Sequence, residues 1–133
     1  MKKYTPAGKL IKAYATMKNY SIADLSNLSG ISYSHLTNLM RGERVIEKKH
    51  IVKIADALKL NHAQREELRE NVFISNKKII LNNEKGDIPN YILKLIYAII
   101  KRRHNISKDM VKKCLDIIGA IKIDPNETYF FGE

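Results

Sequence analysis

Apolar residues recur at every third or fourth position along most of the chain, a pattern typical of amphipathic helices. Five such segments precede residue 76, and residues that favour helix ends separate them. We predict helices over Pro6 to about Lys18, Ser21 (the cap) to Gly30, Tyr33 to Arg41 with Ser32 as the cap, His50 to Lys59, and Asn61 (the cap) to about Ile74. Gly42 to Lys49 is expected to be a polar loop. The pattern therefore predicts an all-α domain over residues 1–75.

Each predicted helix has a stripe of apolar residues that we expect to face a common core. These are Leu10, Ile11, Tyr14 and Met17 in the first, Ile22, Leu25 and Leu28 in the second, Leu36 with Leu39 or Met40 in the third, Ile51, Ile54, Ala55 and Leu58 in the fourth, and Leu68 and Val72 in the fifth.

The C-terminal part follows a polar stretch over residues 76–88, which we expect to be a linker, with Lys78–Leu81 as a candidate short strand. Pro89 opens a helix that is apolar around most of its circumference, and Ser107 caps another. We predict a helical hairpin within residues 89–133, a region for dimerisation or partner binding. Its proposed dimer contacts are Ile92, Leu95, Ile96, Ile99, Ile100, Met110, Leu115 and Ile118. In the tail Thr128–Phe131, two readings stay open: Tyr129, Phe130 and Phe131 add to these contacts, or the tail is disordered.

Charge makes nucleic acid the first partner to consider. The 133 residues hold 24 Lys and Arg against 14 Asp and Glu, a formal net charge of +10. Residues 1–60 contain 11 of these basic and 4 of these acidic side chains, so the N-terminal half carries most of the positive field. Such a field attracts polyanions.

Other classes of protein find little support. Cys114 is the one cysteine, and the four histidines are not spaced as metal ligands, so we expect no metal and no cofactor. The phosphate-loop, nucleophile-elbow and zinc-protease motifs are absent, so we expect no enzyme. The most apolar segment, Ile92–Ile100, is too short to span a bilayer, and we expect a cytoplasmic protein with no membrane partner.

The strongest motif lies between the second and fourth predicted helices. It combines Leu25, Gly30 in a tight turn, Leu36 and Gly42 with a following Ile-Ala-x-Ala-Leu helix. Residues 21–42 read SIADLSNLSGISYSHLTNLMRG, and residues 54–58 read IADAL. This combination resembles the helix-turn-helix family that includes the lambda and 434 phage repressors and Cro. The sequence departs from the family where Ile22 replaces a frequent glutamine and where a proline after Gly42 is missing.

The resemblance implies that the third predicted helix enters the major groove of double-stranded DNA. The base-contacting positions it implies are Tyr33, Ser34 and Asn38, with His35 and Thr37 nearby. Asn38 is the strongest candidate, because its amide can donate to adenine N7 and accept from adenine N6 at the same time. Phosphate contacts are expected from Ser21 and Ser32 through backbone N–H groups, and from Arg41, Arg44, Lys48 and Lys49.

These expectations favour a sequence-specific transcription regulator, a repressor from a phage or mobile element, that binds an inverted-repeat operator as a homodimer. An interaction protein is the alternative. An antitoxin or anti-defence factor would use the same DNA-binding domain for autoregulation and bind another protein through its C-terminal helices.

Overall fold

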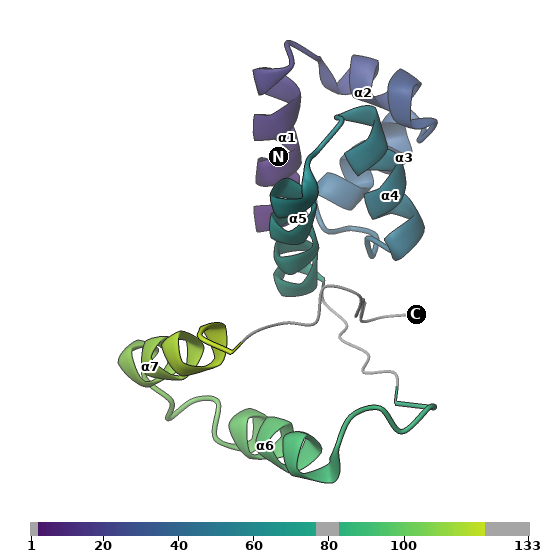
Figure 1. The fold of residues 1–133 in the computed structure, drawn as a ribbon. Coiled ribbons are helices and arrows are strands. Elements are labelled where there is room, and N and C mark those ends of the chain that lie inside the picture. Colours follow the sequence, from purple (N-terminus) through teal and green to yellow (C-terminus); the bar gives the residue numbers. More distant parts are fainter. Residues whose placement is uncertain (1–2, 77–82, 122–133) are drawn as a thin grey trace. The chain divides into compact units, whose positions relative to one another are not determined.

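The structure is a computed structural model that describes residues 3–76 and 83–121, and the regular structure over these residues is helical (Figure 1). The predicted all-α fold class is confirmed. The chain divides into two compact units, one with five helices within residues 3–76 and one with two helices within residues 83–121. The candidate strand Lys78–Leu81 and the tail Thr128–Phe131 lie outside the described residues.

Four of the five helices in the first unit begin with a side-chain cap, and Ser21, Ser32 and Asn61 are the caps that the sequence predicts. The helices are α1 (Pro6–Met17), α2 (Ile22–Ser29), α3 (Tyr33–Met40), α4 (Lys48–Ala57) and α5 (His62–Ser75). The caps of α2 and α3 are Ser21, which accepts from the Asp24 N–H at 3.0 Å, and Ser32, which accepts from the His35 N–H at 3.3 Å. Local sequence therefore places the start of both helices that matter most for the site.

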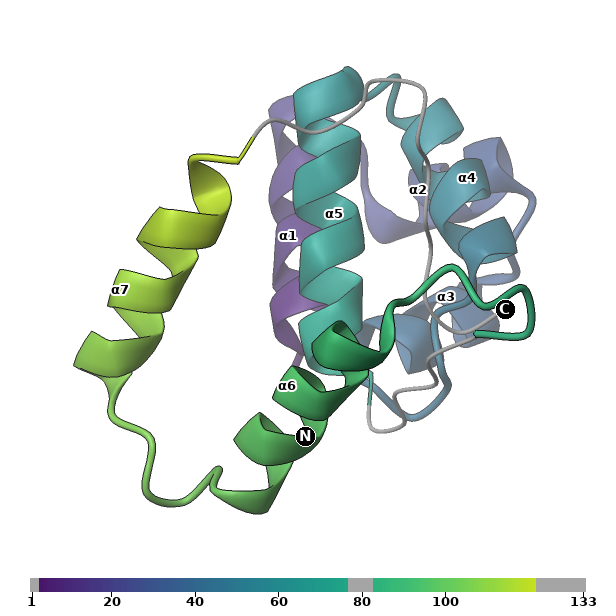
Figure 2. The same ribbon diagram turned by 60° about the horizontal axis from the view of Figure 1, so that its bottom comes forward.

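In this unit α1 and α5 lie side by side, α2 packs against α4, and α3 packs against α1 and α2 (Figures 1 and 2). The largest fully buried side chains come from all five helices or directly follow one of them: Ile11, Leu25, Leu36, Leu39, Met40, Ile54, Leu58, Leu68 and Val72. Both alternatives predicted for α3, Leu39 and Met40, are buried.

Two predicted core positions are wrong. Met17 is 72% exposed at the C-terminal end of α1, and Leu28 is 54% exposed on α2. On α2 the inward position is taken by Ser29, seven residues after Ile22, and its small side chain lies against the turn that follows. The choice between positions 28 and 29 depends on the side from which α3 and α4 cover α2.

The fourth helix begins two residues earlier than predicted, at Lys48, so the loop after Gly42 ends at Glu47. The cause lies in the side chain of His50, whose Nδ1 accepts a hydrogen bond from the Glu47 backbone N–H at 3.0 Å. A histidine at this position supplies the acceptor that Glu or Gln usually provides in the first turn.

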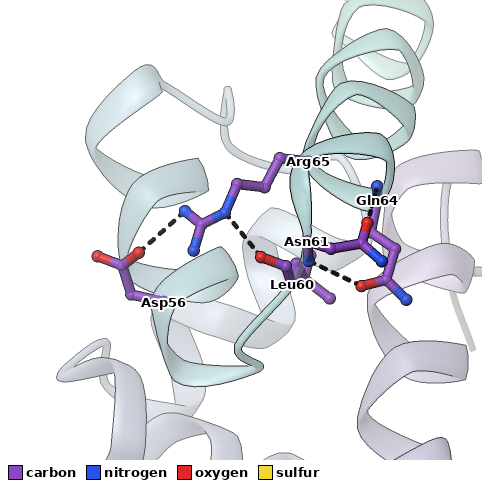
Figure 3. A network of polar contacts seen from close by, with 5 residues as sticks. All are labelled: Asp56, Leu60, Asn61, Gln64 and Arg65. Atoms are coloured by element: carbon purple, nitrogen blue, oxygen red, sulfur yellow. Dashed lines mark hydrogen bonds and ion pairs between the residues drawn. The ribbon is translucent and has the colours of Figure 1, made fainter.

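Polar contacts hold the end of α4 to the start of α5 (Figure 3). Arg65 donates from Nε to the Leu60 carbonyl and from Nη1 to Asp56 Oδ1, both at 2.9 Å. Asn61 and Gln64 exchange backbone-to-side-chain hydrogen bonds of 2.9 and 2.8 Å. These bonds satisfy free N–H groups at the start of α5 and set the direction in which it leaves α4.

The last residues of the first unit close it on itself. Ser75 Oγ accepts from the Ala7 N–H of α1 at 2.9 Å. Asn76, predicted as the first linker residue, pairs through its amide with both backbone groups of Ile46, at 3.1 and 3.2 Å. The loop between α3 and α4 is therefore tied to the end of α5.

The second unit contains α6 (Asn90–Lys101) and α7 (Lys108–Gly119), the two helices of the predicted hairpin. Ser107 Oγ accepts from the Met110 N–H at 3.1 Å, as its predicted role as a cap requires. Neither helix has a buried residue, and the described part of this unit shows no packed interface between them. Their apolar side chains are left exposed.

Candidate DNA-binding surface

The turn between α2 and α3 is a rigid corner built from its own side chains. Gly30 has φ +75°, a conformation that glycine adopts without strain, and its N–H bonds to the Ser26 carbonyl at 3.0 Å. Ser26 Oγ donates to the Ile31 carbonyl at 2.6 Å, and the Ile31 N–H donates to Ser29 Oγ at 3.3 Å. With Ile31 buried, the turn fixes the angle at which α3 projects from α2.

One side of α3 is buried and the other carries most of the predicted base-contacting residues. Leu36, Leu39 and Met40 are fully buried. Ser34 and His35 are exposed, and Asn38 is half-buried. Ser34 and Asn38 are four residues apart, so they lie on one face of the helix. Among the described residues, neither the Ser34 hydroxyl nor the Asn38 amide has a hydrogen-bond partner.

Tyr33 and Thr37 differ although one turn of helix separates them. Tyr33 is the first residue of α3 and is 56% exposed. Thr37 is only 7% exposed, and its hydroxyl donates to the Ser34 carbonyl at 3.0 Å. The inclusion of Thr37 among the base-contacting residues is therefore corrected: this side chain belongs to the buried side of α3.

Hydrogen bonds join the C-terminal end of α3 to the residue before α1. The Met40 carbonyl accepts from the Thr5 N–H at 3.0 Å and from Thr5 Oγ1 at 3.3 Å. Gly8 makes this approach possible, because a Cβ there would lie 2.0 Å from the Met40 oxygen. This role of Gly8 was not predicted from the sequence, although a glycine inside a helix is itself a signal of close packing.

The first turn of α4 lies beside the first turn of α3. The rings of His35 and His50 meet edge to face, with their centroids 5.1 Å apart. Lys48 and Lys49 are the first two residues of α4, so this contact brings them near the N-terminal end of α3. Lys49 also forms an exposed ion pair of 3.4 Å with Glu47, which water screens strongly.

His50 is buried, and burial is the main cause that lowers its pKa from the ordinary 6.5. Electrostatic interactions with His35, Lys49 and Lys53 lower the pKa of His50 further, while the Glu47 carboxylate raises it. The neutral ring is also the form whose Nδ1 accepts the Glu47 N–H. The role of His50 in starting α4 was not predicted from the sequence.

The remaining phosphate candidates have different settings. Ser21 and Ser32 are exposed caps, so the N-terminal ends of α2 and α3, with their free backbone N–H groups, lie at the surface. Arg44 is exposed in the loop after α3. Arg41 is half-buried, and its Nε is buried without a hydrogen-bond partner among the described residues. Arg41 can therefore offer a phosphate only its terminal nitrogens.

Other kinds of site find no support in the described residues. No group of three His, Cys, Asp or Glu side chains over residues 3–76 and 83–121 is arranged to hold a metal ion. In the same part of the chain, no helix has the length and apolar character that crossing a membrane requires.

Comparison with known families agrees with this geometry. Residues 11–64, from the middle of α1 to the first turn of α5, match the family model described as helix-turn-helix. No curated protein and no solved structure shows significant similarity to the chain.

Proposed function

We propose that the chain is a repressor that binds an inverted-repeat operator as a dimer. The premise is that residues 11–64 match the family model of helix-turn-helix DNA-binding domains. The observation that carries the proposal is the outer side of α3. There Ser34 and Asn38 have side-chain polar groups with no hydrogen-bond partner within residues 3–76 and 83–121, on a helix whose other side is buried. Repression requires only that bound protein occupy a promoter.

Phosphate contacts around α3 would supply most of the affinity. Four basic side chains are candidates in each protomer: Arg41, Arg44, Lys48 and Lys49. Each phosphate that a side chain neutralises releases condensed counterions, which makes binding weaker as salt rises. Free backbone N–H groups at the capped starts of α2 and α3 would add contacts that hold the register of the protein on the duplex.

The proposed dimer rests on the second unit. Large apolar side chains of residues 83–121 are exposed there: Tyr91, Ile92, Leu95, Tyr97, Ile99, Ile100, Met110, Val111, Leu115, Ile117, Ile118 and Ile121. Helices of 12 residues are marginal in water unless a packed apolar face supports them. A second copy of the same unit would cover these faces and would place two α3 helices on successive major grooves.

Salt-dependent binding to DNA tests the function directly. The four basic candidates predict a slope of log affinity against log salt of roughly −3 to −4 per protomer. Arg44→Ala should reduce the slope by about 1 for every sequence, whereas Ser34→Ala should weaken binding only to preferred sequences. An affinity that does not change with salt would refute the proposal.

Sedimentation velocity of the full chain tests the dimer. We expect a dimer at micromolar concentration, and we expect Ile100→Asp to convert it to a monomer, because a charge would be buried in the interface. Ile100 is 56% exposed in a single chain, so the new carboxylate reaches water there and is buried only in a dimer. Asn90→Asp in the same helix is the control. A chain ending at Asn76, which keeps the whole core of the first unit, should be monomeric.

The same exposed faces favour one second candidate, an antitoxin or anti-defence protein whose second unit binds another protein. Affinity purification from the native host distinguishes the two. A stoichiometric protein partner that Ile100→Asp releases, together with a monomeric purified chain, would favour this alternative over the dimeric repressor.

A further inference from the structure

The exposed side of α3 carries hydroxyl, imidazole and amide groups but no cationic side chain. Residues 33–40 contain no Lys and no Arg. Arg41 follows the helix directly, but it is half-buried and its Nε is enclosed. Because Arg and Lys are the side chains that most often read guanine through O6 and N7, the surface lacks the usual means of recognising a G·C pair.

Asn38 provides the means of recognising an A·T pair. Its amide carries a donor and an acceptor, and it has no hydrogen-bond partner among the described residues. Adenine presents N7 as an acceptor and N6 as a donor in the major groove, so one amide can satisfy both. The backbone beneath Asn38 is held in place, because its carbonyl accepts from the Glu43 N–H at 2.9 Å. A fixed backbone favours a selective contact.

Tyr33 provides an apolar surface at the tip of the same helix. The residue is 56% exposed at the first position of α3. The thymine methyl group is the apolar feature of the major groove that such a ring can cover. His35, the remaining exposed residue with a ring, is held edge to face against His50 at 5.1 Å, so its position is set by α4.

We propose, on the basis of the proposed function, that each operator half-site is read through A·T pairs. Asn38 bonds to N6 and N7 of one adenine, and the ring of Tyr33 packs against the methyl group of a nearby thymine. Guanine contributes no contact to the side chains of α3.

Base analogues in an operator selected from a random DNA pool test the adenine contact. In 7-deazaadenine a carbon replaces N7, so one such substitution per half-site should weaken binding of the full chain about tenfold or more. The variant Asn38→Ala should bind the 7-deazaadenine operator and the unmodified operator with equal affinity. Asn105→Ala, an exposed asparagine in the loop before α7, is the matched control and should retain the full loss. Replacing any guanine of the operator by 7-deazaguanine should leave the affinity of the chain unchanged.

Deoxyuridine in place of thymine tests the ring contact, because it lacks only the methyl group. We expect a loss of several fold for the natural chain and for Tyr33→Phe, which keeps the ring, and none for Tyr33→Ala. Loss of binding with 7-deazaguanine, or an equal loss for Asn38→Ala with 7-deazaadenine, would overturn the inference while the chain remains a sequence-specific regulator. If the chain enriches no sequence at all, the proposed function itself fails.

Discussion

Replacing Gly8 by alanine tests whether the close approach of α1 to the end of α3 supports the domain. The new Cβ would lie 2.0 Å from the Met40 carbonyl oxygen, whereas ordinary contact begins at 3.4 Å. The other near atoms, Met40 C and Cα, also belong to the backbone, so no side chain can rotate away. The two helices must therefore separate by about 1.4 Å, the difference between those two distances.

The expected cost combines three effects. Overpacking of a buried position costs about 1 to 3 kcal/mol. Separation also breaks the bonds of 3.0 and 3.3 Å from Thr5 to the Met40 carbonyl, each contributing about 1 kcal/mol. Alanine recovers about 1 kcal/mol through its higher helix propensity. We expect the free energy of unfolding to fall by about 2 to 4 kcal/mol.

Urea unfolding followed by circular dichroism measures this change, and chains are compared at one protein concentration because a dimer would make stability depend on it. We expect the midpoint for Gly8→Ala to fall by about 2 M. Gly119→Ala at the end of α7 is the matched control, because a Cβ there meets no atom within 4 Å. If Gly8→Ala unfolds at the same midpoint as the natural chain, the proposed role of this approach is wrong.

Three further outcomes are expected. Because the pKa of His50 is lowered in the folded chain, the unfolded chain binds a proton more readily, so the free energy of unfolding should fall as pH drops below 6.5. This fall should be smaller in His50→Gln. An equal dependence of the free energy of unfolding on pH in both chains, measured by urea titration, would contradict this. Asn76→Ala removes both hydrogen bonds to Ile46 and should cost about 1 to 3 kcal/mol, with faster amide hydrogen exchange at Ile46 as its specific signature; unchanged exchange there would argue against the tether. Tyr14→Phe loses the 3.0 Å bond from its hydroxyl to Glu67 and should cost about 1 kcal/mol in thermal unfolding, whereas a change above about 3 kcal/mol would show that the ring itself has been displaced.

Helix starts and the turn at Gly30 could be predicted from the sequence because their causes are local. Ser21, Ser32 and Ser107 each accept a hydrogen bond from the first turn that follows, over three residues of chain. Capping depends on such short spacings, so sequence shows it directly. The start of α4 was missed because its cap uses His50, a residue type that does not usually indicate a helix start.

The candidate site could be predicted only as far as the family resemblance and helical spacing allow. The resemblance implied Ser34 and Asn38, and their spacing agrees with one shared face, but neither could tell whether Thr37 faced solvent or core. That depends on the side from which α1 and α2 cover α3. The roles of these residues toward DNA stay predictions.

The sequence alone determined the all-α class, the helix-turn-helix motif and most helix boundaries, because each depends on residues close together in the chain. Only the tertiary structure decided which apolar residues are buried, as Leu28 and Met17 show. It alone revealed the contacts between Gly8 and Met40 and between Ile46 and Asn76. These pairs are about 30 residues apart in sequence. Contacts at such separations form only when the packing of several helices brings both partners together, and no local pattern records them.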